Sequence, residues 1–170
     1  MAKLMDDQLE EHGLVLDDVI NALHRPYVVG VYRKDLLSAF VSLRIAERNG
    51  IWYSTDLIND ESISIEIDAL RNYVGEARRR WAFNAARLKT YDRATIVSYE
   101  DVSKTPELVM DKIFTALRLP QRGAVTETVR QNPAPLNKKI RNFYEIGLDQ
   151  MITRGELTLD LEQIFSGNGE

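Results

Sequence analysis

The chain has 170 residues and a formal net charge of -4, with 28% charged and 44% hydrophobic residues. This length suits one domain with a sizeable core, so we expect residues 1–170 to form a single domain. The composition is that of a soluble globular protein, and the negative charge argues against general nucleic-acid binding. No apolar run approaches the ~20 residues of a membrane span.

The sequence has no cysteine and only two histidines, His12 and His24. Disulfides, thiolate metal sites and multi-histidine metal sites are therefore excluded, and a reducing compartment fits. The amino-terminal residues MAKLMDDQLEEHG are acidic and lack the apolar core of a signal peptide. We expect a cytoplasmic protein.

The first elements are short. Ala2–Met5 is a candidate strand fragment, and Asp17 or Asp18 caps a helix that ends near Leu23. Pro26–Tyr32 follows as a predicted strand. Its valines are β-branched and apolar, as a strand buried on both faces requires.

The junction after this strand is the most informative part of the chain. Arg33 stands at the predicted strand's carboxyl end, Asp35 is a good helix N-cap, and Gly50 ends that helix. Ser38 and Ser42 share one face of the helix. Because ligands of open α/β sheets bind at the carboxyl ends of strands, Arg33 and these serines are suited to hold a phosphate. The alternative is a solvated charge at a strand end.

Tyr53–Asp60 reads as a polar loop, and Glu61–Lys89 carries the longest helical pattern. One stripe of this helix is apolar, and the opposite face is rich in arginine, which we interpret as solvated rather than as a binding surface. The apolar stripe consists of Ile67, Leu70, Val74, Ala77, Trp81, Ala85 and Leu88, and the basic face of Arg71, Arg78, Arg79, Arg80 and Arg87.

Ala94–Tyr99 is the second predicted strand. Thr105-Pro106-Glu107 then starts a helix that stops at Leu119-Pro120. The remaining predicted elements are a long loop over Gln121–Pro135, a helix over Asn137–Met151 and a short helix over Thr158–Phe165. Strands that alternate with helices predict a parallel sheet flanked by helices.

Two stretches resemble the sulfotransferase superfamily that uses 3′-phosphoadenosine-5′-phosphosulfate (PAPS). VSYEDVSKTPELVMDKIFTALRLP is similar to the segment in which a strand ends in Tyr-Glu-Asp and a helix leads to Leu-Pro. The stretch from Arg33 through Val41-Ser42 and Ala46 to Gly50-Ile51-Trp52 resembles the 3′-phosphate segment of bacterial trehalose and lipopolysaccharide sulfotransferases. KKIRNFYEI is similar to a family helix with an Asn-aromatic pair, so the resemblance runs from about Ala2 to Leu148.

The resemblance implies a fold related to the P-loop nucleotide kinases, PAPS as cofactor, and a carbohydrate or glycolipid hydroxyl as acceptor. By this resemblance Arg33 and Ser42 hold the 3′-phosphate and Tyr99 lies near the adenine. Arg130, Lys138 and Lys139 lie where the family brings a basic loop to the nucleotide, or else they are surface charges. For Glu100 and Asp101 we prefer a structural cap or salt bridge, for Trp52 a packing role, and for Ser38 a solvated hydroxyl.

One part of the family pattern is missing from the sequence. The family begins with a strand and a loop of Gly, Ser or Thr that cradles the 5′-phosphosulfate with backbone N–H groups. Here Lys3-Leu4-Met5 resembles the strand that follows that loop, so we expect an amino-terminally truncated version of the fold and name no catalytic base.

Three functions remain open. The first is a PAPS-dependent sulfotransferase, or its carboxyl-terminal portion. The second is a non-catalytic remnant that binds an adenine nucleotide with a 3′-phosphate, or nothing. The third is an interaction module that forms a homodimer through the helix at Glu61–Lys89.

Overall fold

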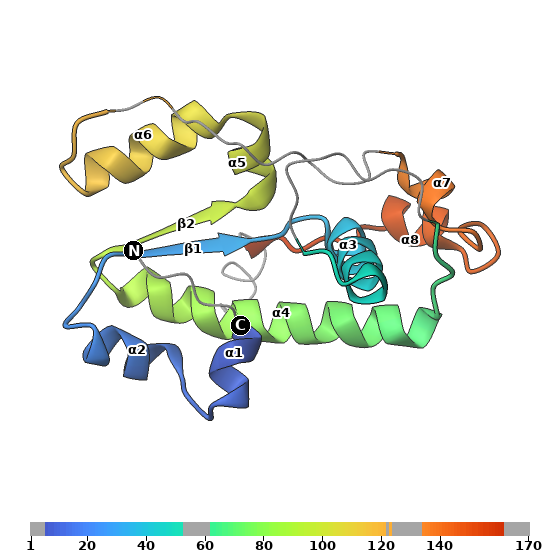
Figure 1. The fold of residues 1–170 in the computed structure, drawn as a ribbon, viewed down its shortest axis with the longest axis horizontal. Helices are drawn as coiled ribbons and strands as arrows, with labels where there is room; N and C mark the ends of the chain where they lie inside the picture. The colour runs from blue at the N-terminus through green and yellow to red at the C-terminus, as the bar shows by residue number, and fades with distance from the viewer. Residues whose placement is uncertain (1–5, 53–61, 122, 124–133, 162–170) are drawn as a thin grey trace.

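A computed structural model describes residues 6–52, 62–121, 123 and 134–161. The chain is mixed α/β, with a small two-stranded parallel sheet and surrounding helices (Figure 1). Strands β1 (Val28–Tyr32) and β2 (Ala94–Ser98) run parallel, with Val28 opposite Ala94 and Tyr32 opposite Ser98. Both predicted strands and their parallel order are confirmed, but β1 begins at Val28 rather than Pro26, and Tyr99 belongs to the helix after β2 rather than to the strand. The helices are α1 (Asp6–Glu11), α2 (Leu16–Ala22), α3 (Leu36–Asn49), α4 (Ile67–Thr90), α5 (Tyr99–Lys104), α6 (Pro106–Ala116), α7 (Leu136–Lys139) and α8 (Leu148–Thr153).

Helix α3 begins and ends where the sequence predicts. The Asp35 carboxylate accepts a hydrogen bond from the Ser38 amide at 2.9 Å, as an N-cap does. Gly50 follows the last turn with a φ of 70°, a left-handed conformation that glycine adopts at little cost. Local capping residues thus determine where α3 begins after β1 and where it ends.

Helix α4 covers one face of the sheet at close range. A Cβ atom on Gly30 of β1 would lie 2.8 Å from Leu88 Cδ1 and 3.5 Å from the Trp81 ring, so only glycine fits there without rearrangement. The Trp81 and Tyr32 rings lie 5.5 Å apart between their centroids. The apolar stripe of α4 is confirmed in part, because Leu70 and its buried neighbours are enclosed while Trp81 is half-buried.

The opposite face of β1 is open, which corrects the prediction of a strand buried on both sides. Val29 is 37% exposed and Val31 is 51% exposed. Within the described residues, β1 packs mainly against β2 and α4. The β-branched run therefore identified the strand correctly but not the number of its buried faces.

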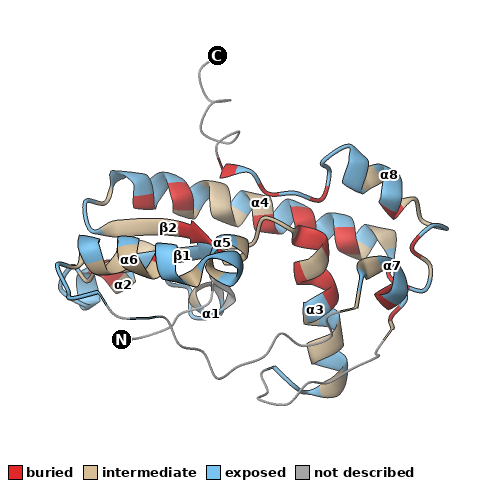
Figure 2. Ribbon diagram, turned by 90° about the horizontal axis from the view of Figure 1, so that it is seen from above, coloured by how far each residue is buried: buried red, intermediate tan, exposed pale blue. Residues whose placement is uncertain are grey.

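The main core lies between α3, α4 and the carboxyl-terminal segment, where the buried residues concentrate (Figure 2). Leu37 and Val41 of α3, Leu70 of α4 and Leu148 of α8 are almost fully buried. Each such side chain contributes roughly 1.5–3 kcal/mol by burial. This core holds α3, and hence the end of β1, in place.

The predicted helix over Asn137–Met151 is wrong in its middle. Helix α7 ends at Lys139 because Ile140 pairs with Ile63 in a parallel bridge. The Asn142 side-chain amide then bonds both backbone groups of Ile65: it donates to the carbonyl at 2.8 Å and accepts from the N–H at 3.0 Å. The pairing of Ile63 and Ile65 is also why α4 starts at Ile67, later than predicted.

Further predictions near helix ends are corrected or lie outside the described residues. Thr105 precedes α6 but makes no capping bond to it, since its hydroxyl donates to the Asp101 carbonyl. Thr158 pairs with Asp35 in an antiparallel bridge and so is not helical. Asp18 supports the start of α2 by accepting the Val15 amide, but the predicted cap position is wrong, since the helix begins at Leu16 with Val15 as its N-cap residue. Ala2–Met5 and Tyr53–Asp60 lie outside the described residues, as does most of the loop over Gln121–Pro135.

The basic face of α4 is only partly solvated. Arg78 donates to the backbone carbonyls of Glu156 and Thr158 at 3.0 and 2.9 Å, so it fixes the carboxyl-terminal segment on α4. Arg79 pairs with Glu76, and Arg87 pairs with Asp17 of α2. The prediction of a solvated face is therefore wrong for Arg78. No helix in the described ranges is long and apolar enough to cross a membrane.

Candidate functional site

Arg33 and Tyr99 meet at the carboxyl ends of the two strands. The register that pairs Tyr32 with Ser98 brings the next residues, Arg33 and Tyr99, side by side. The Arg33 Cζ atom lies 3.3 Å from the centroid of the Tyr99 ring. Ser98 caps α5 by accepting the Asp101 amide at 3.0 Å, which makes Tyr99 the first residue of that helix. Strand register and helix cap together fix this stack.

Stacking leaves the donors of Arg33 available. Arg33 is half-buried, and no described residue forms a hydrogen bond or an ion pair with it. A guanidinium on an aromatic face is held through its plane, while its five N–H donors point outward in that plane. This geometry is suited to a bidentate contact with a phosphate.

Glu100 joins the ends of the two strands. Its carboxylate oxygens accept the backbone amides of Lys34 at 2.9 Å and Asp35 at 3.2 Å. The Lys34 ammonium lies 3.1 Å from an Asp101 carboxylate oxygen in an exposed ion pair. The predicted structural roles of Glu100 and Asp101 are confirmed. Their contacts hold Lys34, the residue that follows Arg33, in place.

A second aromatic side chain lies within reach of the Arg33 charge. Burial raises the pKa of Tyr73 on α4, while the charges of Arg33 and Arg80 act in the opposite direction. Tyr73 also stacks on Phe40 of α3, with ring centroids 5.3 Å apart. Tyr99 of α5 thus contacts the arginine, and Tyr73 of α4 lies close enough to feel its charge. A neutral Tyr73 adds no negative charge to compete with an anion.

The acid side of the pH profile tests the ion pair at the site. Hydrogen bonding with Ser98, and then with Lys34, lowers the pKa of Asp101 below its ordinary value of 3.8. A carboxyl group whose pKa is lower in the folded than in the unfolded state stabilises the fold at pH values above its unfolded pKa. This stabilisation is lost as the pH falls through the pKa of the folded state. Because both partners are about half exposed, we expect Asp101→Asn to cost at most ~1 kcal/mol at neutral pH.

Urea unfolding at neutral pH and below about pH 3 measures the difference in unfolding free energy between the wild type and Asp101→Asn, and this difference should be smaller in acid. Asp111→Asn on α6 is the matched control, since Asp111 forms no ion pair with a described residue. A difference for Asp101→Asn that stays constant across this range would contradict the assignment.

No hydrogen bond or ion pair among the described residues links the other predicted site residues to Arg33. Ser42 is exposed on α3, and its hydroxyl bonds no described residue, so its joining Arg33 in one anion site stays a prediction. Ser38 is not solvated as predicted, because its hydroxyl donates to Asp35 at 2.5 Å. Lys138 is exposed on α7, beyond α3 on the side toward which the strands point (Figures 1 and 2). Arg130 lies outside the described residues.

Two further sequence expectations near the site are corrected. Trp52 is 65% exposed, so the predicted packing role is wrong within the described part of the chain. Lys139, beside Lys138, is buried rather than a surface charge.

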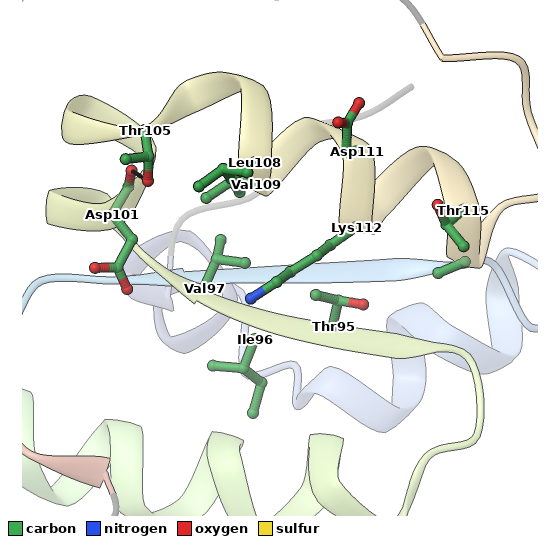
Figure 3. Close-up of a pocket in the computed structure, with 11 residues that line it drawn as sticks. Thr95, Ile96, Val97, Asp101, Thr105, Leu108, Val109, Asp111, Lys112 and Thr115 are labelled. Carbon is green, nitrogen blue, oxygen red and sulfur yellow. Dashed lines mark hydrogen bonds between the residues drawn. The ribbon is translucent and has the colours of Figure 1, made fainter.

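An open hollow that the sequence did not predict lies between β2 and α6 (Figure 3). It measures about 700 Å³ and has an apolar floor that includes Val97 and Val109. Lys112 extends from α6 across this floor, and Asp101 forms part of the rim. Because Asp101 also pairs with Lys34, the hollow begins next to the Arg33–Tyr99 stack. No motif marks it, since it results from the spacing of a helix over a strand.

Comparisons with protein-family models, with curated proteins and with solved structures found no match to this chain. The site provides a guanidinium that stacks on Tyr99 and has no hydrogen-bond partner among the described residues, and a backbone that Glu100 holds at the carboxyl ends of the parallel strands. Such a site can bind an anion that presents two oxygens in one plane.

Proposed function

We propose that this chain is a sulfotransferase-like protein that binds PAPS and transfers its sulfuryl group to a hydroxyl of a carbohydrate or glycolipid. The observation that carries the proposal is the contact between Arg33 and Tyr99. The resemblance assigns these residues, which come from separate motifs, to one cofactor. Their meeting at one edge of the sheet is what a shared ligand requires.

In this proposal Arg33 reads the 3′-phosphate. Its in-plane donors would form charge-assisted hydrogen bonds worth about 1.5–3 kcal/mol each. Tyr99 positions the guanidinium with one ring face, so adenine would stack only on the opposite face. Ser42 remains a proposed further donor, and Arg130 and Lys138 remain proposed basic contacts.

Sulfuryl transfer depends on positioning and on charge stabilisation at the leaving phosphate, as phosphoryl transfer does. Glu100 serves the positioning by fixing the Lys34 and Asp35 amides. The proposed fold is the parallel α/β sheet of the P-loop kinase relatives. The acceptor would supply the attacking hydroxyl, and we assign no catalytic base.

A transfer assay tests the activity. The protein is incubated with PAPS labelled at sulfur and with sugars and glycolipids that carry free hydroxyls. Labelled acceptor is the expected product. A protein that binds adenosine 3′,5′-bisphosphate but transfers no label to any acceptor would not be an enzyme of this class.

A second candidate function is a nucleotide-binding protein without catalysis. It requires only the stack of Arg33 on Tyr99, which offers a phosphate-binding group and contains no group assigned to the transfer step. Arg33 would then read the 3′-phosphate with no group to stabilise sulfuryl transfer. Binding without transfer is the result that this alternative predicts.

A further inference from the structure

Strand β1 presents an unprotected edge in the described structure. The Val28 amide donates to the Arg93 carbonyl, on the β2 side. Because backbone groups alternate along a strand, the amides and carbonyls of Val29 and Val31 point away from β2. No described strand pairs with this outer edge.

The sequence of this edge also lacks the residues that usually prevent strand pairing. Its sequence, VVGVY, contains no charge, no proline and no bulge. Val29 and Val31 are the residues whose side chains are exposed, on the face opposite α4. The backbone groups that point away from β2 and the exposed apolar side chains therefore belong to the same two residues.

We propose that β1 pairs with β1 of a second copy, antiparallel and centred on Gly30, so that two chains share one continuous four-stranded sheet. In this register Val29 lies opposite Val31 of the second copy, and Val31 lies opposite Val29 of the second copy. Each pair exchanges both of its outward N–H and C=O groups. The two-fold axis passes between the two facing Gly30 residues, which makes the interface isologous.

This register is the one that the side chains favour. It brings the exposed valines of both copies together on the open face. Arg33 then lies opposite Tyr27 of the second copy, so the positive charges that follow β1 do not face each other. A shift by one pairing step would place a valine opposite Tyr27 or Arg33 instead. A second copy is also the partner that a sequence nearly symmetric about its glycine fits best.

The proposal is independent of the proposed function and uses a different surface from the helix pairing considered from the sequence. Short strands bury less than the ~1,200 Å² of a standard interface, so association should be weak and visible at high protein concentration. Sedimentation velocity from about 5 to 500 µM covers this range. We expect a reversible dimer that Val31→Lys removes and that Phe83→Lys leaves intact. Phe83 is an exposed apolar residue on α4, 62% exposed.

Cysteine cross-linking tests the register, because the chain has no native cysteine. Directly opposite residues have Cα atoms about 5.5 Å apart, within disulfide range, whereas diagonal residues lie about 7–8 Å apart. An oxidised mixture of Val29→Cys and Val31→Cys chains should therefore cross-link at least fivefold more than either variant alone. Circular dichroism of each variant checks that the fold is retained.

Each other outcome overturns the proposal. A monomer at every concentration excludes the dimer, and a dimer that persists in Val31→Lys places the interface elsewhere. Equal cross-linking of Val29→Cys alone and of the mixture shows a different register. Absence of cross-links in the mixture, with a dimer present, excludes strand pairing at this edge.

Discussion

Arg33→Ala is expected to weaken the binding of adenosine 3′,5′-bisphosphate by tenfold or more. The loss corresponds to about 1.4 kcal/mol, the lower end of what one charge-assisted contact contributes. The guanidinium is stacked on Tyr99 and has no described hydrogen-bond partner, so its removal leaves no buried acceptor unsatisfied. Isothermal titration calorimetry measures the effect. Adenosine 5′-monophosphate, which lacks the 3′-phosphate, should lose much less affinity.

Two variants make this comparison specific. Arg33→Lys retains the charge but not the planar fork, so binding should fall between that of the wild type and that of Arg33→Ala. Arg71→Ala removes an exposed arginine of α4 whose nearest carboxylate oxygen, on Asp68, is 3.7 Å away, and binding should not change. Equal losses for both nucleotides in Arg33→Ala would show that Arg33 does not read the 3′-phosphate.

Trp81→Ala is expected to lower the free energy of unfolding by about 2–3 kcal/mol. A fully enclosed tryptophan would lose about 3–5 kcal/mol, and Trp81 is only half-buried. Its ring packs under β1, against Gly30 and Tyr32, and so supports the strand that leads to Arg33. The free energy of unfolding in urea measures the loss.

Phe83→Ala provides the matched control on the same helix. Phe83 is 62% exposed, so removing its ring should cost less than about 0.5 kcal/mol. Comparable losses in the two variants would mean that Trp81 does not support the sheet. Trp81→Phe, which keeps an aromatic ring under β1, should recover part of the stability.

Local signals in the sequence predicted the elements that carry the site. The β-branched runs identified both strands, and Asp35 and Gly50 set both ends of α3, because caps depend on residues close in sequence. The placement of Arg33 and Tyr99 at strand ends followed from these boundaries. Their mutual contact required the parallel register as well, which only the structure provides.

The predictions that failed depended on partners far away in sequence. The helix predicted over Asn137–Met151 breaks because Asn142 bonds the Ile65 backbone. Arg78 binds carbonyls of the carboxyl-terminal segment although its helical position suggests solvent. Periodicity describes which face of an element is apolar, but it does not identify the group that meets a polar side chain on the other face.

The exposure of β1 has the same origin. Valines at Val29 and Val31 indicate a strand, whereas their burial depends on what packs above them. The hollow between β2 and α6 likewise depends on the distance between two elements rather than on any motif. Neither feature could be found from residue types alone.

The central claim is that Arg33, at the carboxyl end of β1, binds a 3′-phosphate. Calorimetric titration of the intact chain with adenosine 3′,5′-bisphosphate tests this claim most directly. We predict saturable binding with one site per chain and an affinity at least tenfold higher than for adenosine 5′-monophosphate, or about 1.4 kcal/mol. No binding of either nucleotide, or equal binding of both, would contradict the account.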